Sequence, residues 1–179
     1  MTVDVYTPDV GQSPAELRHA VTLYRAVKPQ RVLEIGVLYG GTLKEWIAGG
    51  PELVVAVDPD PLVRDFDTPP GTELRFLVGR SQTFAGEIRA LGPYDWVFID
   101  GDHSYEAVAA DAQLAISVTR TGGHILFHDI VPPEGWPETP PGQVFETLTQ
   151  VYKKFVRYVE PRPDGYPPES ANGIGVIQV

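Results

Sequence analysis

Residues 31–42 read RVLEIGVLYGGT, an apolar run that ends in one glycine and is followed by two more. A short continuous apolar run of this kind is typical of a strand buried on both faces of a parallel sheet. Gly36 closes the predicted strand, and Gly40 and Gly41 form a loop before the next helix. In open α/β sheets the loop after the first central strand is a common ligand-binding position. This stretch therefore predicts a central strand followed by a binding loop.

Predicted strands and helices alternate along the chain on either side of this stretch. Strand patterns recur at residues 53–58, 74–79, 94–100 and 122–129, with helical spacing of apolar residues between the last three. This alternation indicates right-handed βαβ units, and hence a parallel sheet covered by helices on both faces. The predicted fold is a doubly wound, Rossmann-like α/β sheet.

Two further strands are predicted near the end of the chain, at residues 155–159 and 173–179, joined by a proline-rich loop at 161–171. So few residues separate them that we expect antiparallel pairing. They bring the sheet to seven strands, mostly parallel with an antiparallel C-terminal strand. The length of 179 residues suits one domain, residues 1–179.

Local signals predict where three helices start. Ser13 with Glu16, and Thr42 with Glu45, have the spacing of a capping box, in which the two side chains satisfy the first free N–H groups of a helix. Residues 130–142 hold five prolines around Trp136, which predicts a stiff surface loop and a candidate lid, followed by another helix.

Composition excludes several classes of protein. The net charge is −10 and the 14 Lys and Arg residues are scattered, so we expect neither nucleic acid nor an anionic membrane as partner. No apolar run approaches the ~18 residues of a membrane span. The first residues lack the pattern of a secretory signal, and a cytoplasmic protein is expected. The absence of cysteine excludes disulfides, thiolate catalysis and zinc bound through cysteine.

Polar residues gather where the predicted strands end. The carboxyl ends of parallel strands meet at one edge of a sheet, where ligands bind in open α/β folds. An acidic residue at one such position can simply cap the next helix, but its recurrence over several strands favours a functional site. The residues concerned are Glu34, Asp58, Ser81, Asp100, His103, His128 and Asp129.

The glycine loop favours one kind of ligand over another. A dinucleotide fingerprint needs G-x-G-x-x-G, but Leu38 stands at its middle glycine, which argues against a bound pyrophosphate. The free N–H groups at the start of the next helix could instead hold a carboxylate. Asp58 follows about twenty residues after Gly36, the usual position of an acid that binds ribose hydroxyls. The loop therefore predicts a ligand that contains ribose.

In order along the chain, these segments resemble class I S-adenosylmethionine-dependent methyltransferases. The resemblance covers about residues 13–179, and its last two segments resemble the branch of small-molecule O-methyltransferases that includes macrolide, aminocoumarin and rhamnosyl methyltransferases. It implies transfer of a methyl group from S-adenosylmethionine to a hydroxyl of a small polar molecule, a sugar or a natural product. The segments are Leu33-Glu-Ile-Gly36 with Gly40 to Thr42, Asp58, Phe98-Ile-Asp-Gly-Asp-His-Ser-Tyr-Glu106 and Gly122-Gly-His-Ile-Leu-Phe-His-Asp129.

The resemblance implies roles for particular residues of this chain. The first strand and its loop would hold the methionine part of the cofactor, the second strand would bind the ribose diol, and the third would approach the adenine. The end of the fourth strand would lie beside the reacting centre. The implied cofactor-binding residues are Glu34, Gly36, Gly40, Gly41, Thr42, Asp58, Ser81 and Asp100.

The resemblance also implies a metal site at the ends of the fourth and fifth predicted strands. In metal-dependent relatives, the acid that matches Asp100 and an acidic pair ending the next strand bind a divalent cation such as Mg²⁺ or Mn²⁺. This chain has His128 and Asp129 at that pair, so the implied ligands are Asp100, His128 and Asp129. Magnesium prefers oxygen donors, whereas imidazole suits transition metals. A transition metal, or no metal, is therefore the alternative.

Methyl transfer to a hydroxyl needs a group that takes the hydroxyl proton, which a histidine can do. His103 is the candidate base and Asp100 the acid beside it. The alternatives are that His103 stacks on the cofactor at a helix start, and that His128 is a hydrogen-bonded residue of the strand end. Trp136 is the candidate substrate contact, although a loop tryptophan can also pack on the surface.

Two other functions are compatible with the sequence. One is a non-catalytic module that binds S-adenosylmethionine and needs another chain, or a second copy of itself, to complete the acceptor pocket. The other is a nicotinamide oxidoreductase on a similar sheet, which Leu38 in the glycine loop disfavours.

Overall fold

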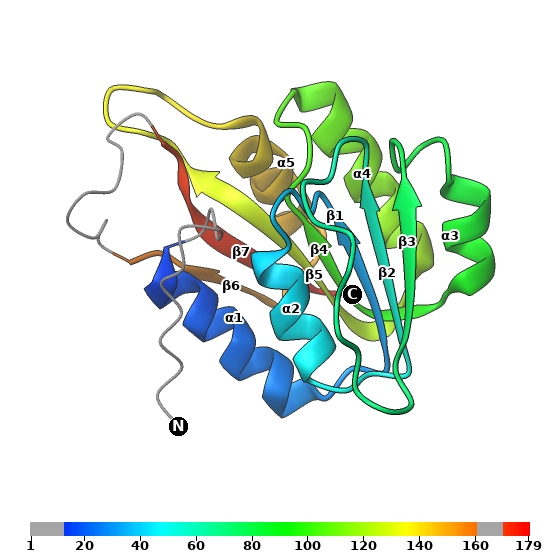
Figure 1. The fold of residues 1–179 in the computed structure, drawn as a ribbon. Coiled ribbons are helices and arrows are strands. Elements are labelled where there is room, and N and C mark those ends of the chain that lie inside the picture. Colours follow the sequence, from blue (N-terminus) through cyan, green and yellow to red (C-terminus); the bar gives the residue numbers. More distant parts are fainter. Residues whose placement is uncertain (1–12, 161–169) are drawn as a thin grey trace.

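The computed structural model describes residues 13–160 and 170–179, so most of the predicted loop at 161–171 lies outside the described residues. Within them the chain forms one seven-stranded sheet in the order β3-β2-β1-β4-β5-β7-β6 (Figure 1). The predicted seven-stranded α/β fold is confirmed. The strands are β1 (Arg31–Ile35), β2 (Leu53–Asp58), β3 (Glu73–Val78), β4 (Tyr94–Ile99), β5 (Thr119–Val131), β6 (Phe155–Tyr158) and β7 (Asn172–Gln178).

Strands β1 to β5 are parallel to one another, and β7 runs antiparallel between β5 and β6. The chain first builds outward from β1 through β2 to β3, and then returns to place β4 on the other side of β1. The strand order therefore reverses between β1 and β4. In open α/β sheets the crevice at this point, beyond the carboxyl ends of the strands, is the usual ligand site.

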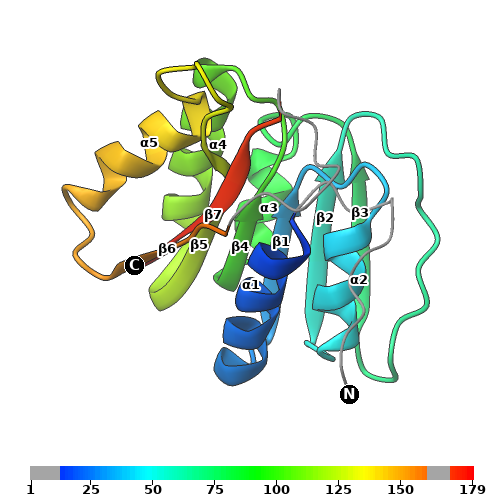
Figure 2. The same cartoon turned by 90° about the vertical axis from the view of Figure 1, so that its left-hand side faces the viewer.

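Helices cover both faces of the sheet, as Figures 1 and 2 show together. On one face, α1 (Pro14–Val27) and α2 (Gly41–Ala48) pack against alternate strand residues such as Val32 and Trp96. On the other, α3 (Ala85–Leu91), α4 (Tyr105–Val118) and α5 (Pro140–Thr149) pack against their neighbours Leu33 and Val97. Burial on both faces explains why the central strands are continuously apolar.

The described helices are short. The longest, α1 and α4, have 14 residues each. Within residues 13–160 and 170–179, no helix combines the length and the apolar character needed to cross a membrane.

Both capping-box predictions are wrong, for one physical reason. Ser13 precedes α1 but makes no capping hydrogen bond through its side chain, and the Glu16 carboxyl group accepts hydrogen bonds from Gly173 N and Glu160 N and not from Ser13. At α2, the Thr42 hydroxyl donates to Glu34 Oε1 at 2.6 Å. In both cases a buried partner from another part of the fold replaces the local contact.

The predicted loop at 130–142 is shorter than expected. Strand β5 continues to Val131, and α5 begins at Pro140, whose ring suits the first turn of a helix. Thr139 caps this helix by accepting a hydrogen bond from Gly142 N at 3.1 Å, and its hydroxyl donates to the Asp129 carbonyl at 2.6 Å. These two hydrogen bonds therefore fix the end of the loop beside Asp129, one of the predicted site residues.

Candidate active site

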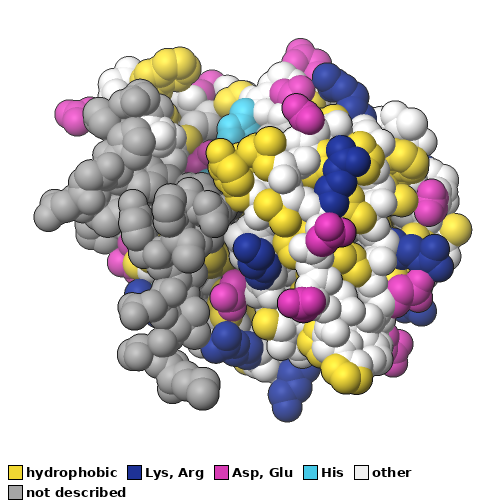
Figure 3. Space-filling view, in the orientation of Figure 1, with side chains coloured by type: hydrophobic (Ala, Val, Ile, Leu, Met, Phe, Trp, Pro, Cys, Tyr) yellow, Lys and Arg dark blue, Asp and Glu magenta, His cyan; other side chains and the backbone are white. Residues whose placement is uncertain are grey.

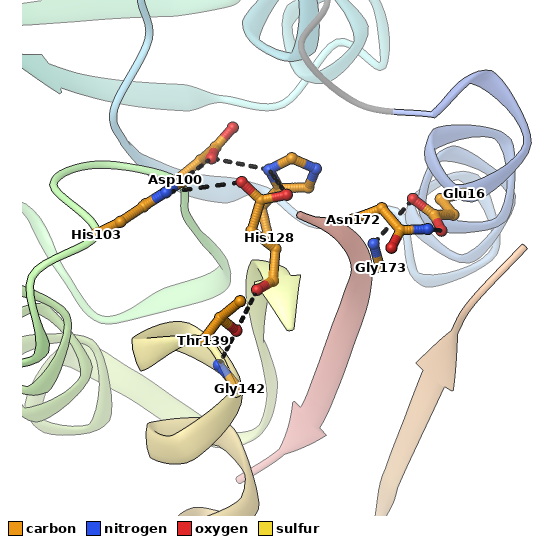
Figure 4. Close-up of polar contacts among 9 residues, drawn as sticks. Glu16, Asp100, His103, His128, Thr139, Gly142, Asn172 and Gly173 are labelled. Atoms are coloured by element: carbon orange, nitrogen blue, oxygen red, sulfur yellow. Dashed lines mark hydrogen bonds and ion pairs between the residues drawn. The ribbon is translucent and has the colours of Figure 1, made fainter. Parts of the chain in front are cut away.

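Four predicted site residues meet where β4 and β5 end (Figure 4). Asp100 follows β4, His128 and Asp129 lie in the last part of β5, and His103 lies just before α4. His103 places one ring nitrogen 3.7 Å from Asp100 Oδ1 and the other 3.7 Å from Asp129 Oδ2. His128 Nδ1 is 3.0 Å from Asp100 Oδ1 and 3.4 Å from Asp129 Oδ1. Two carboxyl groups thus face two imidazoles.

The charges of this cluster stabilise one another. Burial opposes ionisation of Asp100, but the charge of His128 and the hydrogen bond from His103 outweigh it and lower the pKa of Asp100 to about 2. Burial also disfavours a charged His128, yet Asp100 and Asp129 raise the pKa of this imidazole to about 9. The hydrogen bond with Asp100 raises the pKa of His103 against the effect of its burial. An opposite charge nearby favours the ionised form of each partner.

Asp100, His103 and Asp129 have the geometry of a cation site. Each offers one ligand atom, and these atoms all lie within 4.8 Å of one another. His128 is 4% exposed and points Nδ1 at Asp100, so it contacts the cluster as a hydrogen-bond partner. His103 thus joins the two carboxylates in this group, while His128 stays a predicted ligand that contacts both of them.

Asp58 holds the glycine loop in place. Its Oδ2 accepts hydrogen bonds from the backbone N–H groups of Val37 and Leu38 at 2.7 and 2.9 Å, and its Oδ1 accepts one from Asp60 N at 2.7 Å. The loop includes Leu38 at φ 49°, a left-handed conformation that bulky residues rarely adopt. A carboxylate has about four acceptor positions, so Oδ1 retains one for a ligand hydroxyl.

Gly36 brings this loop against the end of β4. It has φ +91°, and a methyl group added to it would stand 2.1 Å from the Asp100 carbonyl oxygen. Only a residue without a side chain allows this approach. The loop after β1 and the end of β4 therefore form one continuous wall.

Two adjoining pockets lie along this wall and share Gly36, Val37, Leu38, Asp100 and Gly101. In Figure 3, a histidine lies beside hydrophobic side chains in the upper part of the face. The parallel strands in Figure 1, drawn in the same orientation, run toward this part. The first pocket, of about 270 Å³, is also lined by Tyr39, Gly41, Thr42, His103, His128 and Asp129. The second, of about 320 Å³, is also lined by Ile35, Val57, Asp58, Pro59, Gly79, Arg80, Ser81, Gln82, Asp102, Ala107 and Asp111.

Three predicted site residues lie outside the two linings. Glu34 is fully buried behind the loop, and burial raises its pKa well above the ordinary value. Its contact with Thr42 makes it a support of the loop. Gly40 faces the Phe66 ring, which a methyl group there would meet at 2.4 Å. Trp136 is 66% exposed on the loop after β5.

Sequence reasoning missed residues of both pockets. Leu38 and Tyr39 lie in the predicted binding loop and line the first pocket, but the sequence analysis did not give either of them a site role. Gln82 and Asp111 line the second. Asp111 could have been found, because it is an acid among the apolar positions of its helix.

The comparisons with known proteins agree with this fold. The profile of a family described as a methyltransferase domain matches residues 33–130, more than half of the chain. No curated protein matches the chain significantly.

Several solved structures have the same fold. Cofactor-bound Rv0187 from MTB is 20% identical with a TM-score of 0.72, over 98% of this chain and 84% of that one. The O-methyltransferase from Bacillus cereus in complex with SAH is 16% identical with a TM-score of 0.67, over 98% and 85%. The MycE methyltransferase of mycinamycin biosynthesis, bound to Mg, SAH and mycinamycin VI, is 20% identical with a TM-score of 0.61, over 90% and 48%.

Fold and strand-end site together define a class I S-adenosylmethionine-dependent methyltransferase, as predicted. The chain belongs to the methyltransferase-domain family whose profile spans residues 33–130. The predicted family resemblance is thus confirmed.

Proposed function

We propose that this protein transfers a methyl group from S-adenosylmethionine to a hydroxyl of a small polar molecule, a sugar or a natural product. One observation carries the proposal: the two pockets join at Gly36 and Asp100. A nucleoside in the second pocket would direct its sulfur-bound methyl group into the first, where His103 and Asp129 stand. The O-methyltransferase bound to SAH, and MycE bound to Mg, SAH and mycinamycin VI, support this proposal.

The residues present fit S-adenosylmethionine. Asp58 keeps an acceptor position for a ribose hydroxyl. Gly41 and Thr42 form the first turn of α2 and line the first pocket, so the N–H groups of that turn are available to the methionine carboxylate. Gly36 lets the loop after β1 lie directly against the backbone of Asp100, so that the two pockets share one wall along which a cofactor would lie.

The chemistry follows from the cluster. S-adenosylmethionine supplies a methyl group on a positively charged sulfur, which leaves as a neutral thioether without a covalent protein intermediate. His103 is the base that takes the hydroxyl proton as the new C–O bond forms. Asp100 and Asp129 flank its two ring nitrogens at 3.7 Å, so they orient the imidazole and stabilise its protonated form. The shared wall keeps acceptor and cofactor in line.

A divalent cation would fit beside the same residues. Asp100, His103 and Asp129 offer two carboxylate oxygens and one imidazole nitrogen, a donor set that suits Mn²⁺ or another transition metal better than Mg²⁺. Such a cation would lower the pKa of an acceptor hydroxyl. If His103 is engaged as a ligand, the carboxylates and solvent are left to take the proton.

The first experiment is calorimetric titration with S-adenosylhomocysteine, with and without Mn²⁺ or Mg²⁺, and with NAD as control. We expect S-adenosylhomocysteine to bind and NAD not to bind. Binding of NAD alone would overturn the proposal in favour of an oxidoreductase. Binding of S-adenosylhomocysteine without methylation of any acceptor in a broad screen would favour the non-catalytic module.

Site variants test the chemistry. Asp100→Asn and Asp129→Ala should abolish turnover and leave the fold unchanged by circular dichroism. Wild-type turnover in either variant would refute the proposed active site. If exhaustive chelation leaves the activity unchanged, the proposed role of a metal is refuted and the rest of the proposal stands.

A further inference from the structure

Strand β5 carries one extra residue at the candidate active site. Three steps along β5, from His128 to Val131, lie opposite only two steps along its partner β7. Such an insertion is a β-bulge, which interrupts the alternation of side chains and turns one of them in a new direction. Asp129 lies inside the bulge and has φ 58°, in the left-handed region. Residues other than glycine rarely adopt this conformation, so we expect the surrounding structure to hold it in place.

The bulge brings two consecutive side chains into one cluster. In a regular strand, neighbouring side chains point to opposite faces of the sheet. Here His128 Nδ1 is 3.4 Å from Asp129 Oδ1. The other carboxylate oxygen, Asp129 Oδ2, is 3.7 Å from His103 Nδ1. The direction of the Asp129 carboxyl group, and hence its contact with the proposed base, therefore depends on the left-handed backbone.

The Thr139 side chain holds this backbone from the far end of the loop. Its hydroxyl donates a hydrogen bond to the Asp129 carbonyl at 2.6 Å and accepts one from Gly142 N at 3.1 Å. Figure 4 shows Thr139 between the end of β5 and the first turn of α5. A hydroxyl has one proton to donate, so the Thr139 proton is committed to Asp129.

Helix α5 is a firm support for this contact. Val144 and Phe145 of the helix are buried in the core. Its first turn also lies directly against the bulge, because a methyl group added to Gly142 would stand 2.5 Å from the Ile130 carbonyl oxygen. The hydrogen bond from Thr139 therefore ties the Asp129 backbone to a packed helix.

We propose that Thr139 is a positioning residue for the methyl transfer, whose hydroxyl keeps Asp129 in the left-handed conformation that directs its carboxyl group toward His103. This inference rests on the proposed function, because the group that Asp129 orients is the proposed base. Thr139 lies outside the linings of both pockets, so it acts through Asp129 and not on a ligand.

Nuclear magnetic resonance of the ligand-free protein tests the conformation. Three-bond backbone couplings of Asp129 report the sign of its φ. We expect a positive φ in the wild type and in Thr139→Ser, which keeps the hydroxyl. Thr139→Val has nearly the same shape without the hydroxyl, so its Asp129 should shift to the negative φ that most residues prefer. A negative φ in the wild type, or a positive φ kept in Thr139→Val, would overturn the inference.

Initial rates test the positioning role, with S-adenosylmethionine and an acceptor that the wild type methylates. Thr139→Val should lose roughly 10- to 100-fold in kcat, because a displaced Asp129 leaves the base poorly oriented. The KM for S-adenosylmethionine should stay at the wild-type value, since the second pocket is unchanged. Thr139→Ser should restore the rate. A wild-type kcat in Thr139→Val would refute the positioning role.

Thr149→Val is the matched control. Thr149 is the last residue of α5, is buried like Thr139, and donates its hydroxyl proton to the Glu146 carbonyl at 2.8 Å. The variant removes a similar hydrogen bond at the other end of the same helix. It should keep the wild-type kcat and the positive φ of Asp129. If it loses as much kcat as Thr139→Val, the effect is general destabilisation and the inference fails.

A second pair of variants covers the case in which Thr139→Val does not fold. In Thr139→Asp, the carboxylate can still accept from Gly142 N and cap α5, but it has no proton for the Asp129 carbonyl. Thr139→Asn has the same shape and an amide that can donate. We expect a low kcat in Thr139→Asp and a kcat near that of the wild type in Thr139→Asn. Equal rates in these two variants would contradict the proposal.

The outcomes separate this inference from the proposed function. If the wild type binds no S-adenosylhomocysteine, or methylates no acceptor, the proposed function fails and the positioning role fails with it. If the wild type methylates an acceptor and the Thr139 variants match its kcat, the positioning role fails and the function stands. Thermal unfolding of each variant verifies that it is folded.

Discussion

At the scale of single residues, the site depends on close contacts that tolerate little change. Gly36 lets the loop after β1 touch the backbone of Asp100, and that contact joins the two pockets. His103 stands between two carboxyl groups that raise its pKa. Both positions were predicted from strand-end patterns. The contacts of Gly36 with Asp100 and of His103 with Asp129 join residues more than twenty positions apart, and only the contact of His103 with Asp100 is local.

Gly36→Ala should both destabilise the protein and impair cofactor binding. The added methyl group would lie 2.1 Å from backbone, so the ends of β1 and β4 must separate. We expect a loss of about 3 kcal/mol or more in the free energy of unfolding, measured in urea. Gly50→Ala is the control, because Gly50 has φ +70° with nothing within 4 Å and should cost only about 1 kcal/mol of backbone strain. Equal losses in the two variants would show that the close contact is not important.

The role of His103 as base predicts a pH dependence. The base must be neutral, and the hydrogen bond with Asp100 raises its pKa above the ordinary value of 6.5. Turnover should therefore rise with pH, with a midpoint above 6.5. His103→Gln should lose this rise and about 10²- to 10⁴-fold in rate. Initial rates over the pH range test this, with His19→Gln at an exposed position of α1 as control. A wild-type pH profile in His103→Gln would refute the assignment.

At the scale of elements, side chains tie strands together at the edge opposite the site. Asp95 in β4 accepts hydrogen bonds from Gln30 N and Arg31 N, both at 2.7 Å, at the start of β1. Its other oxygen accepts from Arg120 Nε in β5. One carboxylate therefore aligns three adjacent strands, which sets where their carboxyl ends lie at the site.

Asp95→Asn should weaken this alignment in a pH-dependent way. Burial opposes ionisation of Asp95, but the Arg120 contact and the backbone N–H groups of Arg31 and Gln30 outweigh it and lower its pKa below the ordinary 3.8. The stabilisation is therefore complete at neutral pH and is lost as the pH falls through the lowered pKa. We expect a loss of about 1–3 kcal/mol at pH 7.

Unfolding free energies at several pH values check this prediction. The difference between Asp95→Asn and wild type should shrink as the medium becomes acidic. Glu52→Gln, an exposed position just before β2, should change little at any pH. A difference that stays constant with pH would mean that the charge of Asp95 does not stabilise the fold.

At the scale of the whole molecule, Glu16 joins the first described helix to the last strand. Its fully buried carboxyl group accepts hydrogen bonds from Asn172 Nδ2 at 3.1 Å and from Gly173 N at 3.0 Å (Figure 4). A third comes from Glu160 N at 3.1 Å. This contact fixes the start of β7, which pairs with β5 beside His128.

Glu16→Ala should destabilise the molecule strongly, because it removes the acceptor of three hydrogen bonds. We expect a loss of about 3 kcal/mol or more in the free energy of unfolding. Hydrogen exchange should also accelerate in β7. Glu106→Ala, an exposed acid in the first turn of α4, is the control and should change stability little. Unchanged exchange in β7 would show that the strand is held without Glu16.

The sequence by itself determined the sheet, the antiparallel C-terminal pair and the edge of the sheet at which most of the candidate site residues lie. Burial of a strand on both faces imposes an apolar run, and strand ends place polar residues at one edge, so both leave local patterns. Only the tertiary structure decided that Glu16 and Thr42 bond to distant partners, that His103 completes the triad with Asp100 and Asp129, and that Asp111 faces the second pocket. These contacts depend on the directions of side chains and on partners that lie far apart in the chain. A buried polar atom bonds to whichever partner the fold brings within reach, and no local pattern records that partner.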